Sequence, residues 1–119
     1  GGVESNADRG ALAAYIFSDR GIYRPGEQIR AAAIVRSQDW SGDLDRLPLR
    51  LEVTDPRGTV VRRETYLAGP AGFGEILHAT KETSPTGTYT LSLSIVRSQY
   101  DSDLIGSTTV QVRDFQPDR

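Results

Sequence analysis

The sequence predicts an all-β protein, built as an antiparallel β-sandwich of about seven short strands. Runs rich in Val, Ile, Leu, Thr and Tyr recur along the 119 residues, and Gly or Pro interrupts them about every ten positions. Apolar and polar residues alternate with a period of two in the clearest runs, and no window has a helical period. In a chain of this length, burial of apolar side chains compensates the conformational entropy lost on folding only if two sheets cover each other. This favours a sandwich of the immunoglobulin or fibronectin type III style.

The first connection is the most informative stretch of the chain. Residues 18–27 run Ser-Asp-Arg-Gly-Ile-Tyr-Arg-Pro-Gly-Glu. Pro25 fixes φ for the second position of a turn, and Gly26 supplies the positive φ that a type II turn needs next. Ser18 and Asp19 are placed to cap the preceding bend through side-chain to backbone hydrogen bonds. The stretch therefore predicts a structural turn that leads into a strand.

The expected strands follow one another between polar turns. They span residues 11–17, 28–36, 48–54, 59–67, 73–80, a segment after Gly87, and 104–113. Within 48–54 the alternation is cleanest, with Leu49, Leu51 and Val53 on the inward face. Asp55-Pro-Arg-Gly58 then fits a type I turn, which closes a hairpin with the next strand. The parity slips after residue 73, which predicts a bulge or bend near Gly74.

The chain is expected to hold one domain with short flanking segments. Residues 1–10 are polar and Gly-rich and are interpreted as a linker or tag remnant. Residues 11–115 are expected to form the domain, and 116–119 to begin a linker to the next domain.

Two polar loops carry aromatic residues that a partner could contact. Trp40 lies in the polar loop 37–46, and Tyr100 lies in residues 97–103, which we expect to form a polar hairpin loop. An exposed contact and a position tucked over the sandwich end are equally good interpretations of Trp40.

Composition excludes several classes of function. The formal net charge is −2, and Arg is interspersed with Asp and Glu, so a nucleic-acid surface is not expected. The chain has no cysteine, which excludes disulfides, thiolate metal ligands and cysteine nucleophiles. No apolar run reaches the length that crosses a bilayer.

Few residues could carry chemistry. His78 is the only histidine, and no Gly-x-Ser-x-Gly motif accompanies it, so an ordinary strand histidine is the preferred interpretation. Residues 69–74 look superficially like a phosphate loop, but Pro70 removes a donor amide and a strand follows, so we expect a hairpin loop. Two acidic pairs offer too few oxygens for a defined calcium site, Asp43 with Asp45 and Asp101 with Asp103. The sequence predicts no catalytic residue, cofactor or metal site.

Two tyrosines are better explained by structure than by chemistry. Tyr23 and Tyr89 each stand near the start of a strand, where a tyrosine can bury its ring and send its hydroxyl to a loop carbonyl, as in a tyrosine corner. The structural motif that we expect in the first connection comprises Asp19, Arg20, Gly21, Tyr23, Pro25 and Gly26.

Four segments together resemble one protein family. They are residues 17–27, 55–58, 84–87 and 106–119, and in order and spacing they are similar to a macroglobulin-like (MG) domain from the N-terminal half of bacterial alpha-2-macroglobulins. The resemblance covers about residues 11–119. It implies a large periplasmic protein, lipid-anchored to the inner membrane, that traps proteases.

By this resemblance the chain is a non-catalytic scaffold. Some family members carry a reactive Cys-x-x-Gln thioester, but this sequence has no cysteine, so none of the family's reactive residues transfers to it. The implied partners are neighbouring macroglobulin domains of the same chain and target proteases engaged by the full-length protein, with a cell-wall synthase as a further candidate. The isolated domain is expected to be a monomer without cofactors.

Two alternatives remain open. A β-sandwich module that binds an envelope protein or a cell-wall glycan would use the loop aromatics Trp40 and Tyr100. A small hydrolase would have only His78 in its favour.

Overall fold

The computed structural model describes residues 12–37 and 46–115. Within them lie eight strands and a short 3₁₀ turn: β1 (Leu12–Ser18), β2 (Ile22–Tyr23), β3 (Gln28–Ser37), β4 (Pro48–Thr54), β5 (Val60–Leu67), η1 (Pro70–Gly72), β6 (Phe73–Ala79), β7 (Gly87–Ser98) and β8 (Asp101–Val112).

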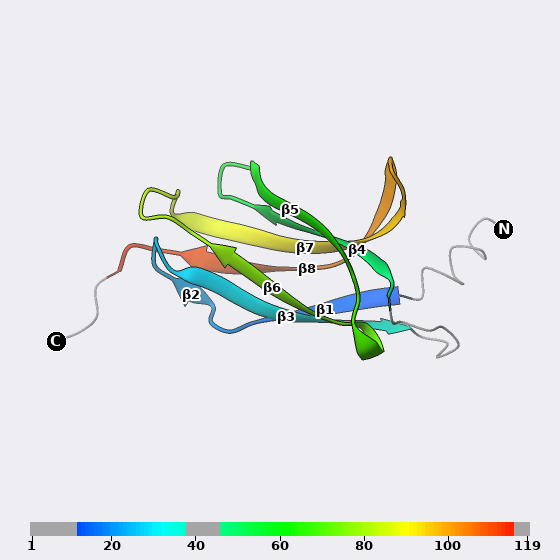
Figure 1. Ribbon diagram of the computed structural model, residues 1–119. Coiled ribbons are helices and arrows are strands. Elements are labelled where there is room, and N and C mark those ends of the chain that lie inside the picture. Colours follow the sequence, from blue (N-terminus) through cyan, green and yellow to red (C-terminus); the bar gives the residue numbers. More distant parts are fainter. Residues whose placement is uncertain (1–11, 38–45, 116–119) are drawn as a thin grey trace.

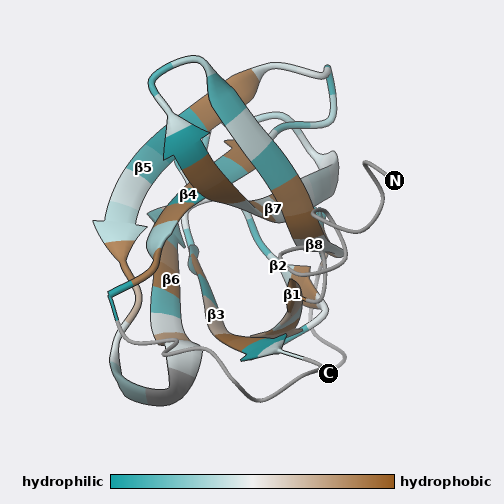
Figure 2. Cartoon of the chain, turned by 90° about the vertical axis from the view of Figure 1, so that its right-hand side faces the viewer, coloured by the Kyte–Doolittle hydropathy of each residue, from teal (hydrophilic) through white to brown (hydrophobic). Residues whose placement is uncertain are grey.

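The strands form two sheets that lie face to face (Figures 1 and 2). One sheet has the order β1-β3-β6 and the other the order β2-β8-β7-β4-β5. All neighbours are antiparallel except β2 and β8, which pair in parallel over two residues. The prediction of an antiparallel sandwich is confirmed, with β2 added to the strands expected from the sequence.

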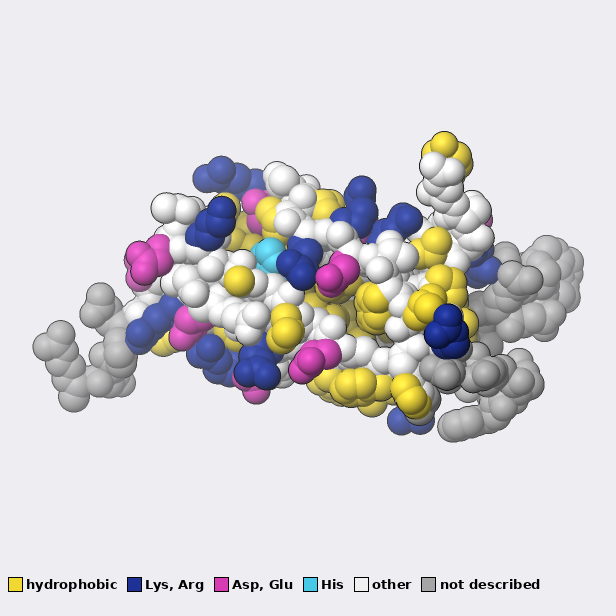
Figure 3. Space-filling view, in the orientation of Figure 1, with side chains coloured by type: hydrophobic (Ala, Val, Ile, Leu, Met, Phe, Trp, Pro, Cys, Tyr) yellow, Lys and Arg dark blue, Asp and Glu magenta, His cyan; other side chains and the backbone are white. Residues whose placement is uncertain are grey.

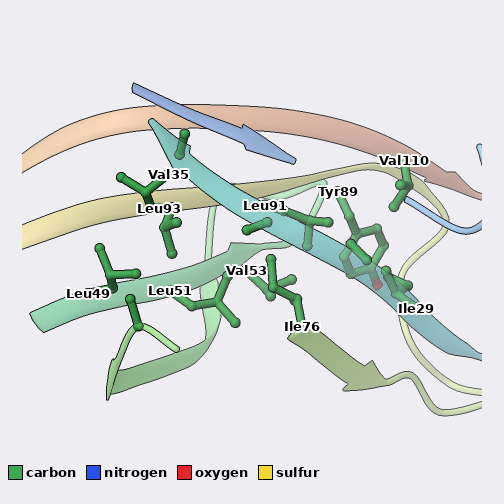
Figure 4. Packing of buried hydrophobic residues seen from close by; sticks show 14 of the residues in the cluster. Ile29, Val35, Leu49, Leu51, Val53, Ile76, Tyr89, Leu91, Leu93 and Val110 are labelled. Carbon is green, nitrogen blue, oxygen red and sulfur yellow. The ribbon is translucent and has the colours of Figure 1, made fainter. Parts of the chain in front are cut away.

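The core fills the space between the sheets (Figure 4). Alternate residues of β4 and β7 point inward, and these include Leu51 and Leu91, which have no exposed surface. Ile29 and Val35 of β3 and Ile76 of β6 meet them from the opposite sheet, also fully buried. At roughly 25 cal/mol per Å² of apolar surface removed from water, this layer is the main favourable contribution to folding.

Asp55 shapes the hairpin between β4 and β5. The Gly58 N–H donates to the Asp55 carbonyl over 3.0 Å. Asp55 Oδ1 accepts the N–H groups of Arg57 (2.9 Å) and Thr59 (3.0 Å). The carboxylate therefore accepts hydrogen bonds from two backbone amides of the turn that would otherwise bond to water. The β4–β5 pairing confirms the predicted hairpin.

Two glycines let the sheets approach at the sides of the sandwich. A Cβ on Gly106 of β8 would lie 2.3 Å from the carbonyl oxygen of Ala14 in β1. A Cβ on Gly74 of β6 would lie 2.7 Å from the hydroxyl of Tyr66 in β5. At Gly106 the obstacle is backbone, so packing requires glycine there, whereas at Gly74 the obstacle is the end of the Tyr66 side chain.

The structure corrects two expectations about strand regularity. Residues 97–103 are not a polar loop, because β7 runs to Ser98 and β8 starts at Asp101. No bulge lies at Gly74, since β3 and β6 pair in unbroken register from Gln28↔Ala79 to Ile34↔Phe73. Phe73 instead faces outward, 49% exposed, and the apparent slip in parity came from counting it as a core residue. Register shifts occur elsewhere, between Val53 and Thr54 and along β7–β8.

A third correction concerns residues 69–74. They do not close a hairpin: β5 belongs to the larger sheet and β6 to the smaller, so the segment with η1 crosses between sheets. Trp40 and the Asp43/Asp45 pair lie outside the described residues, as do residues 1–10 and 116–119.

Candidate functional site

The motif around residues 19–27 forms a compact turn at one end of the sandwich. The Glu27 N–H donates to the Arg24 carbonyl over 3.0 Å, and Gly26 has a φ of 96°. Pro25 and Gly26 thus occupy the two central positions of a turn with the positive φ that type II geometry requires.

Thr80 fastens this turn to the end of β6. Its Oγ1 accepts the Gly26 N–H over 2.9 Å and donates to the Glu27 carbonyl over 2.6 Å. The Thr80 N–H donates to the same carbonyl over 3.1 Å. The sequence does not single out Thr80, because 53 positions separate it from Glu27 and no local pattern marks the contact.

Tyr23 anchors the motif from inside. Its side chain is fully buried, and its hydroxyl accepts the Arg20 N–H over 3.1 Å and donates to the Arg30 carbonyl over 3.2 Å. The Arg20 guanidinium lies 4.6 Å from the ring centroid. The hydroxyl therefore has partners on both sides of the connection, as a buried tyrosine requires.

The remaining motif residues serve the backbone. The Asp19 N–H donates to the Arg30 carbonyl (2.8 Å), and the Gly21 carbonyl accepts the Gln111 N–H (2.8 Å). The second contact is part of the parallel β2–β8 pairing. Each of these interactions holds a chain segment in place.

The Glu27 carboxylate, at the end of the motif, has a shifted pKa. Its Oε1 accepts the Arg24 N–H over 2.8 Å and lies 3.2 Å from an Arg20 guanidinium nitrogen. The hydrogen bond from Arg24 and the positive charge of Arg20 lower the pKa of this carboxyl below its ordinary value. Glu27 therefore stays ionised and bonded at neutral pH.

Tyr89 forms a tyrosine corner at the start of β7. Its ring is 1% exposed, and its hydroxyl donates to the Pro85 carbonyl over 2.7 Å. Burial raises the pKa of this phenol. The bond ties the β6–β7 connection to the strand that follows it, as in other sandwiches.

Among the described residues, no hydrogen bond orients the Nδ1 side of the His78 ring. Burial lowers its pKa, and the charge of Arg62 on β5 lowers it further. Its Nδ1 is buried without a hydrogen-bond partner in the described part of the chain, so the orienting contact that a catalytic histidine needs is missing.

The acidic pair Asp101 and Asp103 lies at the β7–β8 hairpin. Asp103 forms an ion pair with Arg97 across the two strands. Among residues 12–37 and 46–115, no group of three or more His, Cys, Asp or Glu side chains is placed to hold a metal ion. Tyr100 lies at the hairpin turn and is 90% exposed.

One surface feature did not enter the predicted sites. The outer face of the smaller sheet exposes large apolar side chains, including Tyr15 at 53%, Phe17 at 58% and Phe73 at 49%. The sequence contained a signal for it, because both faces of residues 11–17 are apolar whereas a strand with one wet face alternates with polar residues.

A comparison with protein families identifies this fold. The MG2 domain model matches residues 13–112, nearly all of the described sandwich. This chain belongs to the MG2 domain family. The chain is 44% identical over 114 residues to an alpha-2-macroglobulin of Rickettsia conorii. It is 41% identical over 119 residues to an alpha-2-macroglobulin homolog of Yersinia pestis.

These relatives are far longer than this chain. The alignments cover 96% and 99% of this chain but 6% of each relative. A solved structure of Salmonella alpha-2-macroglobulin reacted with methylamine aligns with a TM-score of 0.72 and 27% identity, over 90% of this chain and 6% of that one. The resemblance to bacterial alpha-2-macroglobulins is therefore confirmed. No helix in the described residues is long and apolar enough to span a membrane.

Proposed function

We propose that this MG2 domain is a non-catalytic structural domain of a bacterial alpha-2-macroglobulin that traps proteases. The observation that carries the proposal is the pair of alignment lengths: nearly the whole chain matches alpha-2-macroglobulins, and it accounts for 6% of their length. A match of this kind is what one module of a large multidomain protein gives. The motif residues support it, because their hydrogen bonds hold backbone segments together.

The geometry suits a rigid spacer. β1 begins beside the end of β3, where Leu12 pairs with Ser37, whereas β8 ends beside Tyr23 and Gly87. The chain thus enters the sandwich at one end and leaves at the other (Figure 1). Flanking domains attached at these ends are held apart by the length of the sandwich, which positions a protease-binding region without chemistry from this domain.

Protease sequestration by the full-length parent tests the proposal. A trapped protease should lose activity on a large protein substrate while still cleaving a small peptide substrate, because entrapment blocks access and leaves the catalytic site free. The 119-residue chain alone should inhibit neither reaction and hydrolyse no ester, peptide or glycoside. A parent that leaves cleavage of the protein substrate unchanged, or hydrolysis by the chain that His78→Ala abolishes, would refute the proposal.

The location of the parent is part of the same proposal. The family resemblance supports a periplasmic protein anchored by lipid to the inner membrane, where target proteases, and a cell-wall synthase as a candidate partner, would meet it. Osmotic-shock release and membrane fractionation of cells that express the full-length protein test this placement. Recovery of the protein in the cytoplasmic fraction would contradict it.

The exposed Tyr100 favours a second candidate function, a module that binds an envelope protein or cell-wall glycan. An aromatic ring with 90% exposure at a hairpin tip is available for stacking on a sugar or a protein surface. NMR titration of the chain with cell-wall fragments tests it, and unchanged resonances at residues 97–103 would exclude glycan binding at this tip.

A further inference from the structure

The smaller sheet carries an apolar surface on the side away from the core. Cross-strand pairing places Tyr15, Ile34 and Phe73 in one row, from β1 through β3 to β6. Phe17 lies in the adjacent row beside Ala32 and Glu75, and Leu77 lies in the row after that, beside Arg30. We call Tyr15, Phe17, Ile34, Phe73 and Leu77 the outer patch.

The outer patch is too apolar to be an ordinary wet sheet face. Tyr15, Phe17 and Phe73 are 53%, 58% and 49% exposed, and Leu77 is 38% exposed. With about 200 Å² for each aromatic side chain, three half-exposed rings present roughly 300 Å² of apolar surface. Contiguous patches of this size on a small protein often mark an interaction site. Figure 3 shows hydrophobic side chains gathered along the lower right, beneath the smaller sheet.

Charged groups border the aromatic part of the outer patch and separate it from Leu77, since Glu75 lies between Phe73 and Leu77 along β6 and Arg30 pairs with Leu77. A hollow beside Phe17 is lined by Asp19, Arg30 and Glu75, together with the small residue Ala32. Charges of both signs therefore stand next to an apolar centre. An apolar core with a polar rim is the usual anatomy of a protein–protein contact.

The size and position of the outer patch favour a neighbouring domain of the same polypeptide over a second copy of the chain as its partner. Interfaces between domains of one chain bury about 300–750 Å² on each side, whereas a stable dimer of separate chains needs about 800 Å² on each side. The patch matches the smaller class, and tethering raises the effective concentration enough for such a contact to form. Its Tyr15 row lies three residues from Leu12, where the sandwich begins, so a domain joined at that end can reach it.

We propose that the outer patch is the docking surface for a neighbouring domain of the same polypeptide, one that packs from the end of the sandwich where β1 begins. The proposal rests on the proposed function, because it needs the longer parent in which this chain is a small fraction of the length. The partner surface is apolar at its centre, with charged groups at its edge that complement Arg30 and Glu75.

Hydroxyl-radical footprinting compares the patch in the isolated chain and in the full-length parent. In the parent, the oxidation rates of Tyr15, Phe17 and Phe73 should each fall to about one third of their values in the isolated chain, or lower, since an interface core excludes solvent. Equal rates in both proteins would overturn the proposal. Protection that is already complete in the isolated chain would also overturn the proposal, because other residues of the same chain would then cover the patch. Protection that appears only at high protein concentration would overturn it too, because a second copy of the chain would then cover the patch.

A matched pair of variants links the protection to the patch. Phe17→Lys places a charge in the patch, whereas Leu104→Lys places one at a 65% exposed apolar position on the opposite sheet. Both isolated variants should unfold at the wild-type temperature within a few degrees. In the parent, Phe17→Lys should restore rapid oxidation of Phe73 and Leu104→Lys should not. Protection of Phe73 that survives Phe17→Lys would overturn the proposal.

Photo-crosslinking separates this proposal from the proposed function. Benzoylphenylalanine in place of Tyr15 in the parent should give a cross-link within one polypeptide, mapped by mass spectrometry to another domain. A cross-link only to a different molecule would overturn the proposal. If the intrachain cross-link forms but the parent sequesters no protease, the protease-trapping function fails while the docking surface stands.

Discussion

The close approach of β8 to β1 at Gly106 leads to a quantitative prediction. In Gly106→Ala the new Cβ would lie 2.3 Å from the Ala14 carbonyl oxygen and 2.9 Å from the Ala14 Cβ, and Cβ atoms essentially never approach another heavy atom within 3.0 Å. The obstacle is backbone, held in register by the β1–β3 pairing, so no side chain can swing away. The two sheets must separate locally, and overpacking of this kind costs about 1–3 kcal/mol.

An opposing effect sets the net value. Replacing glycine by alanine restricts the unfolded chain and contributes about 0.4–1 kcal/mol of stability where the native backbone tolerates it. The clash is larger, so we expect Gly106→Ala to lose about 1–2 kcal/mol. Gly21→Ala is the matched control, because a Cβ there meets nothing within 4 Å, and it should be neutral or slightly stabilising.

Urea denaturation of the 119-residue chain measures both variants. The midpoint should fall for Gly106→Ala and stay or rise for Gly21→Ala, with unchanged slopes if only native stability differs. In a thermal melt, 1 kcal/mol corresponds to about 4 °C for a domain of this size. Equal stability of the two variants would refute the argument that the sheets are in contact at this corner.

Three further predictions concern the core and the turn. Leu91→Ala removes a fully buried side chain and should cost about 2–5 kcal/mol in chemical denaturation; a loss below about 0.5 kcal/mol would mean that this face is not core. Gly26→Val forces a β-branched residue to a φ of 96° and should cost about 1–3 kcal/mol, so an unchanged melting temperature would contradict the turn geometry. The pKa of Glu27 is lower in the folded chain than in the unfolded one, so its ionised carboxylate stabilises the fold at pH values above the ordinary glutamate pKa of about 4.3. This contribution disappears as the pH falls through the lower folded pKa. Glu27→Gln should therefore be less stable than wild type at pH 7, and the difference should shrink as the pH falls below the ordinary pKa of a glutamate. A difference that stays constant as the pH falls would count against the Arg24 and Arg20 contacts.

The sequence predicted those parts of the fold whose determinants are local. Residues 48–54 match β4 end to end, because one buried face and one wet face leave a period-two pattern that fixes the register. Pro25 and Gly26 identify their turn through backbone constraints that no distant contact alters.

Features that depend on distant segments were missed. β2 consists of two residues that exist as a strand only by pairing with β8, so residues 22–23 carry no pattern of their own. The β7–β8 hairpin extends through the polar residues 97–103, which need not alternate because both faces are wet. Phe73 has the composition of a core residue and lies on the outer patch, and its direction depends on its pairing with Ile34.

The parallel pairing of β2 with β8 determines how the domain responds to tension. β1, β2 and β8 all run toward the end where β8 finishes, and hydrogen bonds join Gly21 to Gln111 and Tyr23 to Arg113. A pull on the two ends of the chain slides these strands along their length, so the bonds between them are loaded in shear and must fail together. A domain clamped in this way transmits a displacement from one end of the sandwich to the other before it extends.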